Sequence, residues 1–279
     1  MRYRTIAVHV NDSDHNAERV RIAADLALRN DAHLVGVAVT GLPAALYMPG
    51  MADEAVLLSA YLDTMNRQAA DALAEFEGVA DRAGVALFEK RVVEDDPGVA
   101  LCLQARYSDL VVIGQDDPDE SLLGQRADMP AYVVLNAGRP VLIVPYAGTF
   151  NSVGKRIVVA WDGGVQSSRA VSLAMPFLMQ AEQVQVALFD AQAETPLDEL
   201  PGADIGQYFA RHGINVEVSR ESAGDDIDIG NALLSHLSDF GADLLVMGGY
   251  GHSRFREILL GGVTRTVLQA MTAPVLMTH

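Results

Sequence analysis

The chain carries one pattern twice, and this internal repeat limits the fold more than any other feature of the sequence. Residues 4–12 (RTIAVHVND) match residues 155–163 (KRIVVAWDG) at an offset of 151. Two later segments, 109–114 and 139–144, match segments that begin at Asp243 and Ala273, both at an offset of 134. A chain of 279 residues is therefore expected to hold two copies of one domain, each large enough to build its own core.

The two offsets differ by 17 residues, so the first copy carries an insertion between its matched segments. We place it in residues 41–60, where Gly-Leu-Pro and Met-Pro-Gly interrupt any regular element. Its apolar part, residues 42–51, has three open interpretations: a lid, an oligomer contact, or a segment packed on its own domain. The copies meet at residues 146–152, which predicts domains at 1–148 and 152–279.

Short apolar runs rich in β-branched residues alternate with longer runs at helical spacing. Since the short runs are apolar at every position, they predict parallel strands buried on both faces. The clearest strands are 157–160, 184–188, 244–247 and 274–277, and the clearest helices are 16–28, 53–83 and 263–271. The predicted fold is α/β, with two tandem doubly wound domains, in which ligands bind at the carboxyl ends of the strands beside the topological switch point.

The charge balance excludes several classes of partner. The chain has 20 Lys and Arg against 37 Asp and Glu, a formal charge of −17, which argues against nucleic-acid and anionic-membrane surfaces.

The chain has a single cysteine, Cys102. It therefore has no intrachain disulfide and no cysteine-based metal site, and its histidines lack metal-ligand spacing. No run of eighteen apolar residues occurs, so we expect a cytoplasmic protein without a membrane segment.

A glycine-rich segment, residues 248–264, directly follows the predicted strand 244–247. Glycines at such a strand end allow close backbone approach to a ligand and present amide groups to an anion. Gly261 and Gly262 lead into the predicted helix 263–271, whose first amides suit a phosphate. The alternative is that Gly248 and Gly261 are turn and cap residues without a ligand.

Two other nucleotide motifs are missing from the sequence. No Gly-x4-Gly-Lys-Ser/Thr occurs, and the two lysines, Lys90 and Lys155, lie far from any glycine loop, which excludes a P-loop triphosphatase. No Gly-x-Gly-x-x-Gly follows a first strand, so a dinucleotide-binding site has no support.

The spacing Gly248-x2-Gly251-x9-Gly261, after an apolar strand and before a helix and the sequence APVL, resembles the nucleotide loop of the ATP-binding universal stress proteins. The strand-start segments and the Pro-Val-Leu strands match that family too, so the resemblance covers nearly the whole chain. It implies a tandem universal stress protein with Rossmann-like, adenine nucleotide alpha hydrolase-like domains. It further implies a regulatory role in the stress response, with ATP as the ligand.

The resemblance implies that Gly248, Gly251 and Gly261 form the phosphate and ribose loop, and that Asp162 contacts the adenosine part. Asp162 has a second interpretation, as a cap of the following helix. The family usually carries Ser or Thr after the third glycine, where this chain has Gly262, so a hydroxyl would have to come from Thr264 or Ser253. The full set of expected nucleotide-binding residues is Ala160, Trp161, Asp162, Phe189, Gly248, Gly251, His252, Ser253, Arg254, Gly261, Gly262, Val263 and Thr264.

Within this set, Ala160, Trp161 and Phe189 are candidates for lining the adenine slot, with core packing as the alternative role of Phe189. Arg254 and His252 are candidates for phosphate contacts in place of the missing lysine, and a solvated helix face or a loop cap are their alternatives. Mg²⁺ is a candidate counter-ion that would offset further phosphate charge.

The first copy lacks the glycine loop. After Gly114 it reads QDDPDESLLG, with four acids, and Asn11 stands where the second copy has Asp162. Because these acids would repel a triphosphate, we predict that the first copy has lost the nucleotide site. It would then complete an intrachain pseudo-dimer, with strand 141–144 near strand 275–277, and a homodimer of the chain is a further option. A cation site at the acids is the alternative.

The leading hypothesis is an ATP-binding regulatory protein with one site, in the second domain. No general base or activated nucleophile accompanies the loop, so we assign no catalytic residue and expect at most slow hydrolysis. A rival is an adenylating enzyme, because residues 162–167 (DGGVQS) faintly resemble the Ser-Gly-Gly-x-Asp-Ser loop of ATP pyrophosphatases. A third hypothesis is a nucleotide-free ligand-sensing or interaction module.

Overall fold

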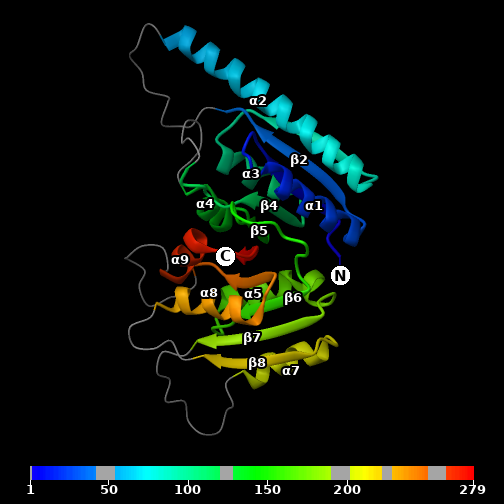
Figure 1. Cartoon of the computed structure of the whole chain (residues 1–279), viewed down its shortest axis with the longest axis vertical. Helices are drawn as coiled ribbons and strands as arrows, with labels where there is room; N and C mark the ends of the chain where they lie inside the picture. The colour runs from blue at the N-terminus through cyan, green and yellow to red at the C-terminus, as the bar shows by residue number, and fades with distance from the viewer. Residues whose placement is uncertain (1, 42–53, 120–127, 190–201, 222–227, 251–261) are drawn as a thin grey trace. The chain divides into compact units, whose positions relative to one another are not determined.

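The computed structural model describes residues 2–41, 54–119, 128–189, 202–221, 228–250 and 262–279 (Figure 1). The chain divides into two compact units, Arg2–Ala147 and Gly148–His279. Within each unit five strands pair in parallel and helices pack on them, which confirms the predicted α/β fold with tandem doubly wound domains.

In the first unit, five parallel strands lie in the order β3-β2-β1-β4-β5. Helix α1 contacts α2, and α3 contacts α4. The elements are β1 (Thr5–Val10), α1 (Asn16–Asn30), β2 (His33–Val39), α2 (Glu54–Ala83), β3 (Phe88–Val93), α3 (Pro97–Ala105), β4 (Leu110–Gly114), α4 (Met129–Asn136) and β5 (Val141–Val144).

The second unit repeats this arrangement with the strand order β10-β9-β6-β7-β8, again parallel. Its elements are β6 (Arg156–Ala160), α5 (Val165–Leu173), α6 (Met175–Leu178), β7 (Gln183–Phe189), α7 (Ala203–Arg211), β8 (Val216–Glu221), α8 (Ile229–Phe240), β9 (Leu244–Gly248), α9 (Gly262–Ala270) and β10 (Val275–Thr278).

The central strands form the cores because they are apolar on both faces. In β4 the four residues from Leu110 to Ile113 are all buried, as are the four residues of β5 and of β10. Successive residues of a strand point to opposite faces, so burial at every position means that both faces of the sheet are covered. The apolar runs of the sequence therefore correspond to the buried centre of each sheet.

A carboxylate clamp ties the amino ends of two neighbouring strands together in each unit. Asp109, just before β4, accepts hydrogen bonds from the backbone amides of Arg4 and Thr5 at 2.7 and 3.1 Å. Asp243, just before β9, accepts in the same way from the amides of Gly154, Lys155 and Arg156 at 2.8 to 3.1 Å. The two copies thus share the hydrogen bonds that fix this edge of the sheet.

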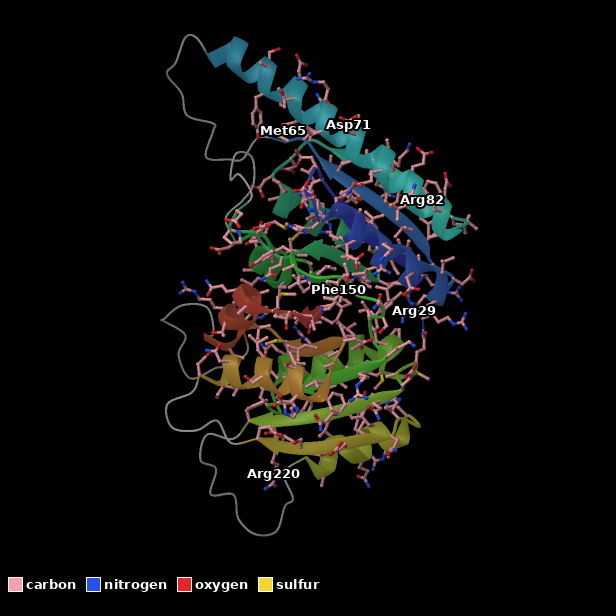
Figure 2. The ribbon with its side chains drawn as sticks, viewed as in Figure 1. Arg29, Met65, Asp71, Arg82, Phe150 and Arg220 are labelled. Carbon is pink, nitrogen blue, oxygen red and sulfur yellow. The ribbon has the colours of Figure 1, made fainter. Side chains whose placement is uncertain are left out.

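Helix α2 crosses one face of the first sheet, and Figure 2 labels Met65 and Asp71 along its length. Its Phe76 is fully buried and packs edge-on against Phe88 at 5.8 Å between ring centroids. A Cβ on Gly36 of β2 would lie 2.8 Å from the Phe76 ring, so the glycine makes room for it. The helix begins at Glu54, inside the predicted insertion, whereas residues 42–51 lie outside the described residues.

Candidate functional site

The candidate sites lie where the strand order changes direction. In the first unit β1 pairs with β2 on one side and with β4 on the other, and in the second unit β6 pairs likewise with β7 and β9. The loops that follow β1 and β4, and those that follow β6 and β9, therefore border a crevice at the carboxyl edge of each sheet.

In the second unit, Asp162 lies exposed just after β6. Its Oδ1 accepts a hydrogen bond from the amide of Gly164 at 2.8 Å, and the intervening Gly163 has a φ of +71°, in the region that favours glycine. Asp162 therefore holds the turn before α5, whereas the N-cap residue of the helix is Gly164, which makes no side-chain capping hydrogen bond. Its Oδ2 makes no hydrogen bond within the described residues, so one oxygen is available to a ligand.

The residues expected to line an adenine slot are partly buried. Ala160 ends β6, and the amide of Trp161 donates to the carbonyl of Ala187 at 3.0 Å. Phe189 ends β7 and meets the ring of His236 on α8 edge-on, with centroids 6.1 Å apart. Phe189 therefore has a packing partner, in line with its alternative role in the core.

Gly248 has a structural reason to be glycine without any ligand. A Cβ at this position would lie 2.6 Å from the backbone of Gln166 and Ser167, because the first turn of α5 approaches the end of β9 closely. Any side chain at residue 248 would push α5 away from the sheet.

The next two amides are already used inside the protein. The amide of Gly249 donates to the carbonyl of Thr278 at 2.7 Å, and that of Tyr250 donates to Oγ1 of Thr264 at 3.3 Å. Amides for an anion are therefore not supplied by residues 249 and 250. The contact of Thr264, which is 4% exposed, instead fixes the first turn of α9 beside the end of β9.

The first residue of α9 is exposed. A Cβ built on Gly262 would meet no atom of the described residues within 4 Å, while Val263 beside it is partly buried. Five of the expected ligand residues lie outside the described part of the chain: Gly251, His252, Ser253, Arg254 and Gly261.

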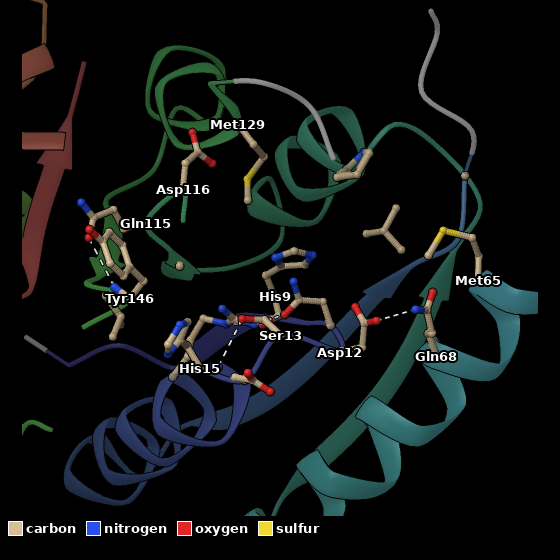
Figure 3. Close-up of a pocket in the computed structure, with 18 of the residues that line it drawn as sticks. His9, Asp12, Ser13, His15, Met65, Gln68, Gln115, Asp116, Met129 and Tyr146 are labelled. Carbon is tan, nitrogen blue, oxygen red and sulfur yellow. Dashed lines mark hydrogen bonds between the residues drawn. The ribbon is translucent and has the colours of Figure 1, made fainter. Parts of the chain in front are cut away.

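The first unit contains a cavity of about 510 Å³ at the corresponding crevice (Figure 3). Its base is formed at the ends of β1 and β4, where His9, Arg19 and Gln115 lie, all of them buried. One wall is made by α2, which contributes Tyr61 and Met65. The glycine pattern of the sequence directs attention to the second copy and does not predict this cavity.

Arg19 organises the base of the cavity. It is 3% exposed, and its Nε donates to the carbonyl of His9 at 2.8 Å. Its Nη2 donates to the side-chain oxygens of Asn11 and Asn16. A Cβ on Gly114 would lie 2.6 Å from Nη1, so this glycine admits the guanidinium between β1 and β4.

His9 is 7% exposed and faces the cavity. Burial, reinforced by the positive charge of Arg19, lowers the pKa of His9 to about 3. The imidazole is therefore neutral at physiological pH, with one nitrogen able to donate and the other able to accept a hydrogen bond. No hydrogen bond of this ring is formed within the described residues.

Carboxylates surround the mouth of the cavity. Asp12 accepts a hydrogen bond from Gln68 of α2 at 2.5 Å, while Asp14 and Asp116 are exposed and line the opening. Asp117 next to it pairs with His15 at 3.1 Å. Of the acids noted in the sequence after Gly114, Asp116 thus lines a cavity in the fold.

The fold described above agrees with the comparisons to known proteins. The family model described as universal stress protein family matches residues 2–145 and again 154–279. The chain belongs to the universal stress protein family, in a tandem form, as the resemblance of the glycine loop and strands indicated.

A universal stress protein of Synechocystis sp. is 25% identical over 178 residues, which cover 57% of this chain and 58% of that protein. The match therefore spans somewhat over half the length of this relative. Among solved structures, a universal stress protein from Archaeoglobus fulgidus has a TM-score of 0.74 at 18% identity, over 98% of this chain and 95% of that one. A candidate universal stress protein from Pseudomonas aeruginosa has a TM-score of 0.58 at 16% identity, over 99% and 93%. These similarities support the fold.

Two features are absent from the described residues. No helix in that part of the chain is long and apolar enough to cross a membrane. Nor do three or more His, Cys, Asp or Glu side chains come together there in a way that would hold a metal ion.

Proposed function

We propose that this universal stress protein binds ATP through its second domain and acts as a nucleotide-dependent regulator. The observation that carries the proposal is the exposed first turn of α9. Gly262 is exposed, a Cβ on it would meet no atom of the described residues within 4 Å, and it follows the segment whose glycine spacing resembles the family's nucleotide loop.

The first turn of α9 suits a phosphate group. The first four amides of an α-helix have no partner within the helix, and the helix dipole favours negative charge there. The hydrogen bond from Tyr250 to Thr264 keeps this turn next to β9, at the carboxyl edge of the sheet. In this proposal the amides of Gly262 and Val263 donate hydrogen bonds to the phosphate. The amides of Gly249 and Tyr250 do not, because they already donate to groups of the protein.

The adenosine part would extend toward β6 and β7. Oδ2 of Asp162 can accept a hydrogen bond from a ribose hydroxyl or an adenine amino group while Oδ1 continues to hold Gly164. Trp161 and Phe189 offer partly exposed aromatic surface at the ends of the same strands. Arg169 and Arg265 are exposed on α5 and α9 and add positive charge to a domain that is otherwise acidic.

We propose regulation rather than catalysis, with Mg²⁺ entering on the phosphate oxygens of the nucleotide. Catalysed hydrolysis needs a base or a positioned water, and the sequence offers no group for that task beside the loop. We expect turnover to be slow. Formation of AMP and pyrophosphate would instead support the adenylating enzyme.

The test is isothermal titration calorimetry of the full chain with ATP and Mg²⁺, using the matched variants Gly262→Glu and Gly262→Gln. Both side chains enter open space, so both proteins should fold. The glutamate places a negative charge beside the phosphates and should weaken ATP binding about tenfold or more relative to the glutamine.

We expect one ATP per chain in the wild type. Equal affinities of the Glu and Gln variants would show that the phosphates do not lie at α9. A stoichiometry of two would contradict the prediction that the first domain has lost its nucleotide site.

A further inference from the structure

We propose that the cavity of the first domain binds a small organic cation with an apolar body, and not a phosphate-bearing ligand. The site and its ligand class are separate from the ATP site of the second domain, so either proposal can fail without the other. The proposal rests on one buried side chain, on the charges at the opening and on the walls.

The base of the cavity offers an unused hydrogen-bonding group. His9 is 93% removed from solvent and lines the cavity, and its ring has no hydrogen bond within the described residues. The Tyr61 hydroxyl is also buried without a partner among these residues. Since a buried polar group without a partner is costly, both groups fit a site completed by a ligand that carries polar hydrogens and acceptors.

The opening selects for positive charge. Asp12, Asp14 and Asp116 line it, and among the lining residues that the structure describes the group of opposite charge is the guanidinium of Arg19. With histidines counted as neutral, these described lining residues carry three carboxylates and one guanidinium, a net charge of −2. A phosphate would be repelled there, whereas an ammonium group would be attracted.

The second copy shows that these charges are particular to the first. By the offsets of the repeat, the positions of Asp12, Asp14 and Asp116 correspond to Gly163, Val165 and Tyr250, none of which is charged. His9 likewise stands where the second copy has Ala160. The first crevice thus differs from the second at its opening in the direction that disfavours an anion, whereas at its base it has Arg19 where the second has Ala170 and Asn11 where the second has Asp162.

Arg19 does not convert the cavity into an anion site. Its Nε and Nη2 donate to oxygens of β1, of the loop after it and of the first residue of α1, and Nη1 lies against Gly114. The guanidinium is therefore held in the floor by the protein's own groups.

The lining also has an apolar part, and the cavity is large enough for an organic molecule. Val39, Met65, Met129 and Val144 contribute to a volume of about 510 Å³, within the usual range of small-molecule pockets. Methionines adapt to irregular apolar shapes, which suits an aromatic or aliphatic body. A hydrated metal ion would leave these walls without a contact.

The test uses three probes that share an indole body and differ in charge: tryptamine, 3-ethylindole and indole-3-propionate. Each is titrated into the full chain by calorimetry. We expect tryptamine to bind at one site per chain, about tenfold or more tighter than indole-3-propionate, with 3-ethylindole between them. Addition of salt should weaken tryptamine binding more than 3-ethylindole binding.

Variants locate the site. Asp116→Asn and Asp14→Asn should each weaken tryptamine binding about threefold to tenfold, whereas Asp119→Asn, an exposed carboxylate outside the cavity lining, should leave it unchanged. Met65→Trp should fill the cavity and abolish binding. In NMR spectra, the ring signals of His9 should shift on addition of tryptamine.

Tighter binding of indole-3-propionate than of tryptamine would overturn the proposal. So would tryptamine binding that ignores Asp14, Asp116 and Met65, or binding of Ca²⁺ alone at these aspartates with no binding of tryptamine.

Discussion

At the scale of single residues, two substitutions within the repeat separate the two crevices. His9 and Arg19 occupy the positions of Ala160 and Ala170, so the first copy buries an imidazole and a guanidinium where the second buries methyl groups or leaves space. A buried arginine is retained only where its donors find acceptors, and here the carbonyl of His9 and the side chains of Asn11 and Asn16 serve. These two side chains therefore give the base of the first crevice polar groups that the second crevice lacks at the same positions.

The neutral state of His9 makes stability depend on pH. In the unfolded chain its pKa is near 6.5, and in the folded protein it is about 3, so the unfolded state binds the extra proton between these values. The free energy of unfolding should therefore fall on acidification, by about 2 kcal/mol between pH 7 and pH 5 from this residue alone.

The measurement is urea unfolding of the wild type and of His9→Ala across this range. The variant should lose most of that pH-dependent difference, whatever its stability at pH 7. A wild type and a variant with parallel pH profiles would show that folding does not lower the pKa of His9.

The sequence predicted residues of the second crevice better than it predicted their roles. Asp162 and Gly248 lie at the predicted edge, but Asp162 also caps its own loop, and Gly248 makes room for the backbone of α5. The sequence offered a capping role for Asp162 as an alternative, but the contact of Gly248 with α5 has no signal in the sequence, because it depends on how closely two elements approach. The cavity of the first unit escaped prediction for a related reason: the acids after Gly114 indicate charge but no cavity, and the unpaired ring of His9 becomes evident only from its surroundings.

At the scale of elements, the hydrophobic pattern of the sequence was sufficient to predict the long helix and the strands that are buried on both faces of the sheet. The long helix α2 and the strands β6, β7, β9 and β10 agree with their predicted ranges to within one or two residues. The strands β3 (FEKRVV) and β8 (VEVSRE) were not singled out, since each contains three charged residues and has exposed positions. Each pairs on one side within the described residues, with β2 and β7 respectively.

Helix α2 depends on Phe76 for its position on the first sheet, and this helix also supplies a wall of the cavity. Phe76→Ala should lower the free energy of unfolding by about 3–5 kcal/mol, the usual cost of removing a buried phenylalanine. Asp71→Ala, an exposed position on the same helix, should change it by less than about 0.5 kcal/mol. Chemical denaturation of both variants checks this, and similar losses for the two would mean that α2 is not anchored by its buried face.

At the scale of the whole chain, the internal repeat alone was sufficient to identify two domains of one fold. The same offsets cannot reveal that one copy holds a cavity with an acidic opening, because the cavity comes from loops that follow different strands. The pairing of strand 141–144 with strand 275–277 and the formation of a homodimer both stay predictions.

Two sites of opposite preference in one chain lead to a further expectation. Saturating ATP with Mg²⁺ should leave the stoichiometry of tryptamine at one per chain, since the nucleotide occupies the second domain and the amine the first. Sequential titrations measure this directly. Displacement of one ligand by the other would show that they share a site, and would contradict the assignment of separate ligands to the two domains.

The clamps of Asp109 and Asp243 carry a consequence for how such a protein diversifies. They secure the strands at their amino ends, remote from the loops that meet ligands. After gene duplication, the loops of each domain can therefore change and bind different ligands while the clamps that hold the strands together are kept. For the same reason, the loops of one domain could be exchanged by design without altering the clamps.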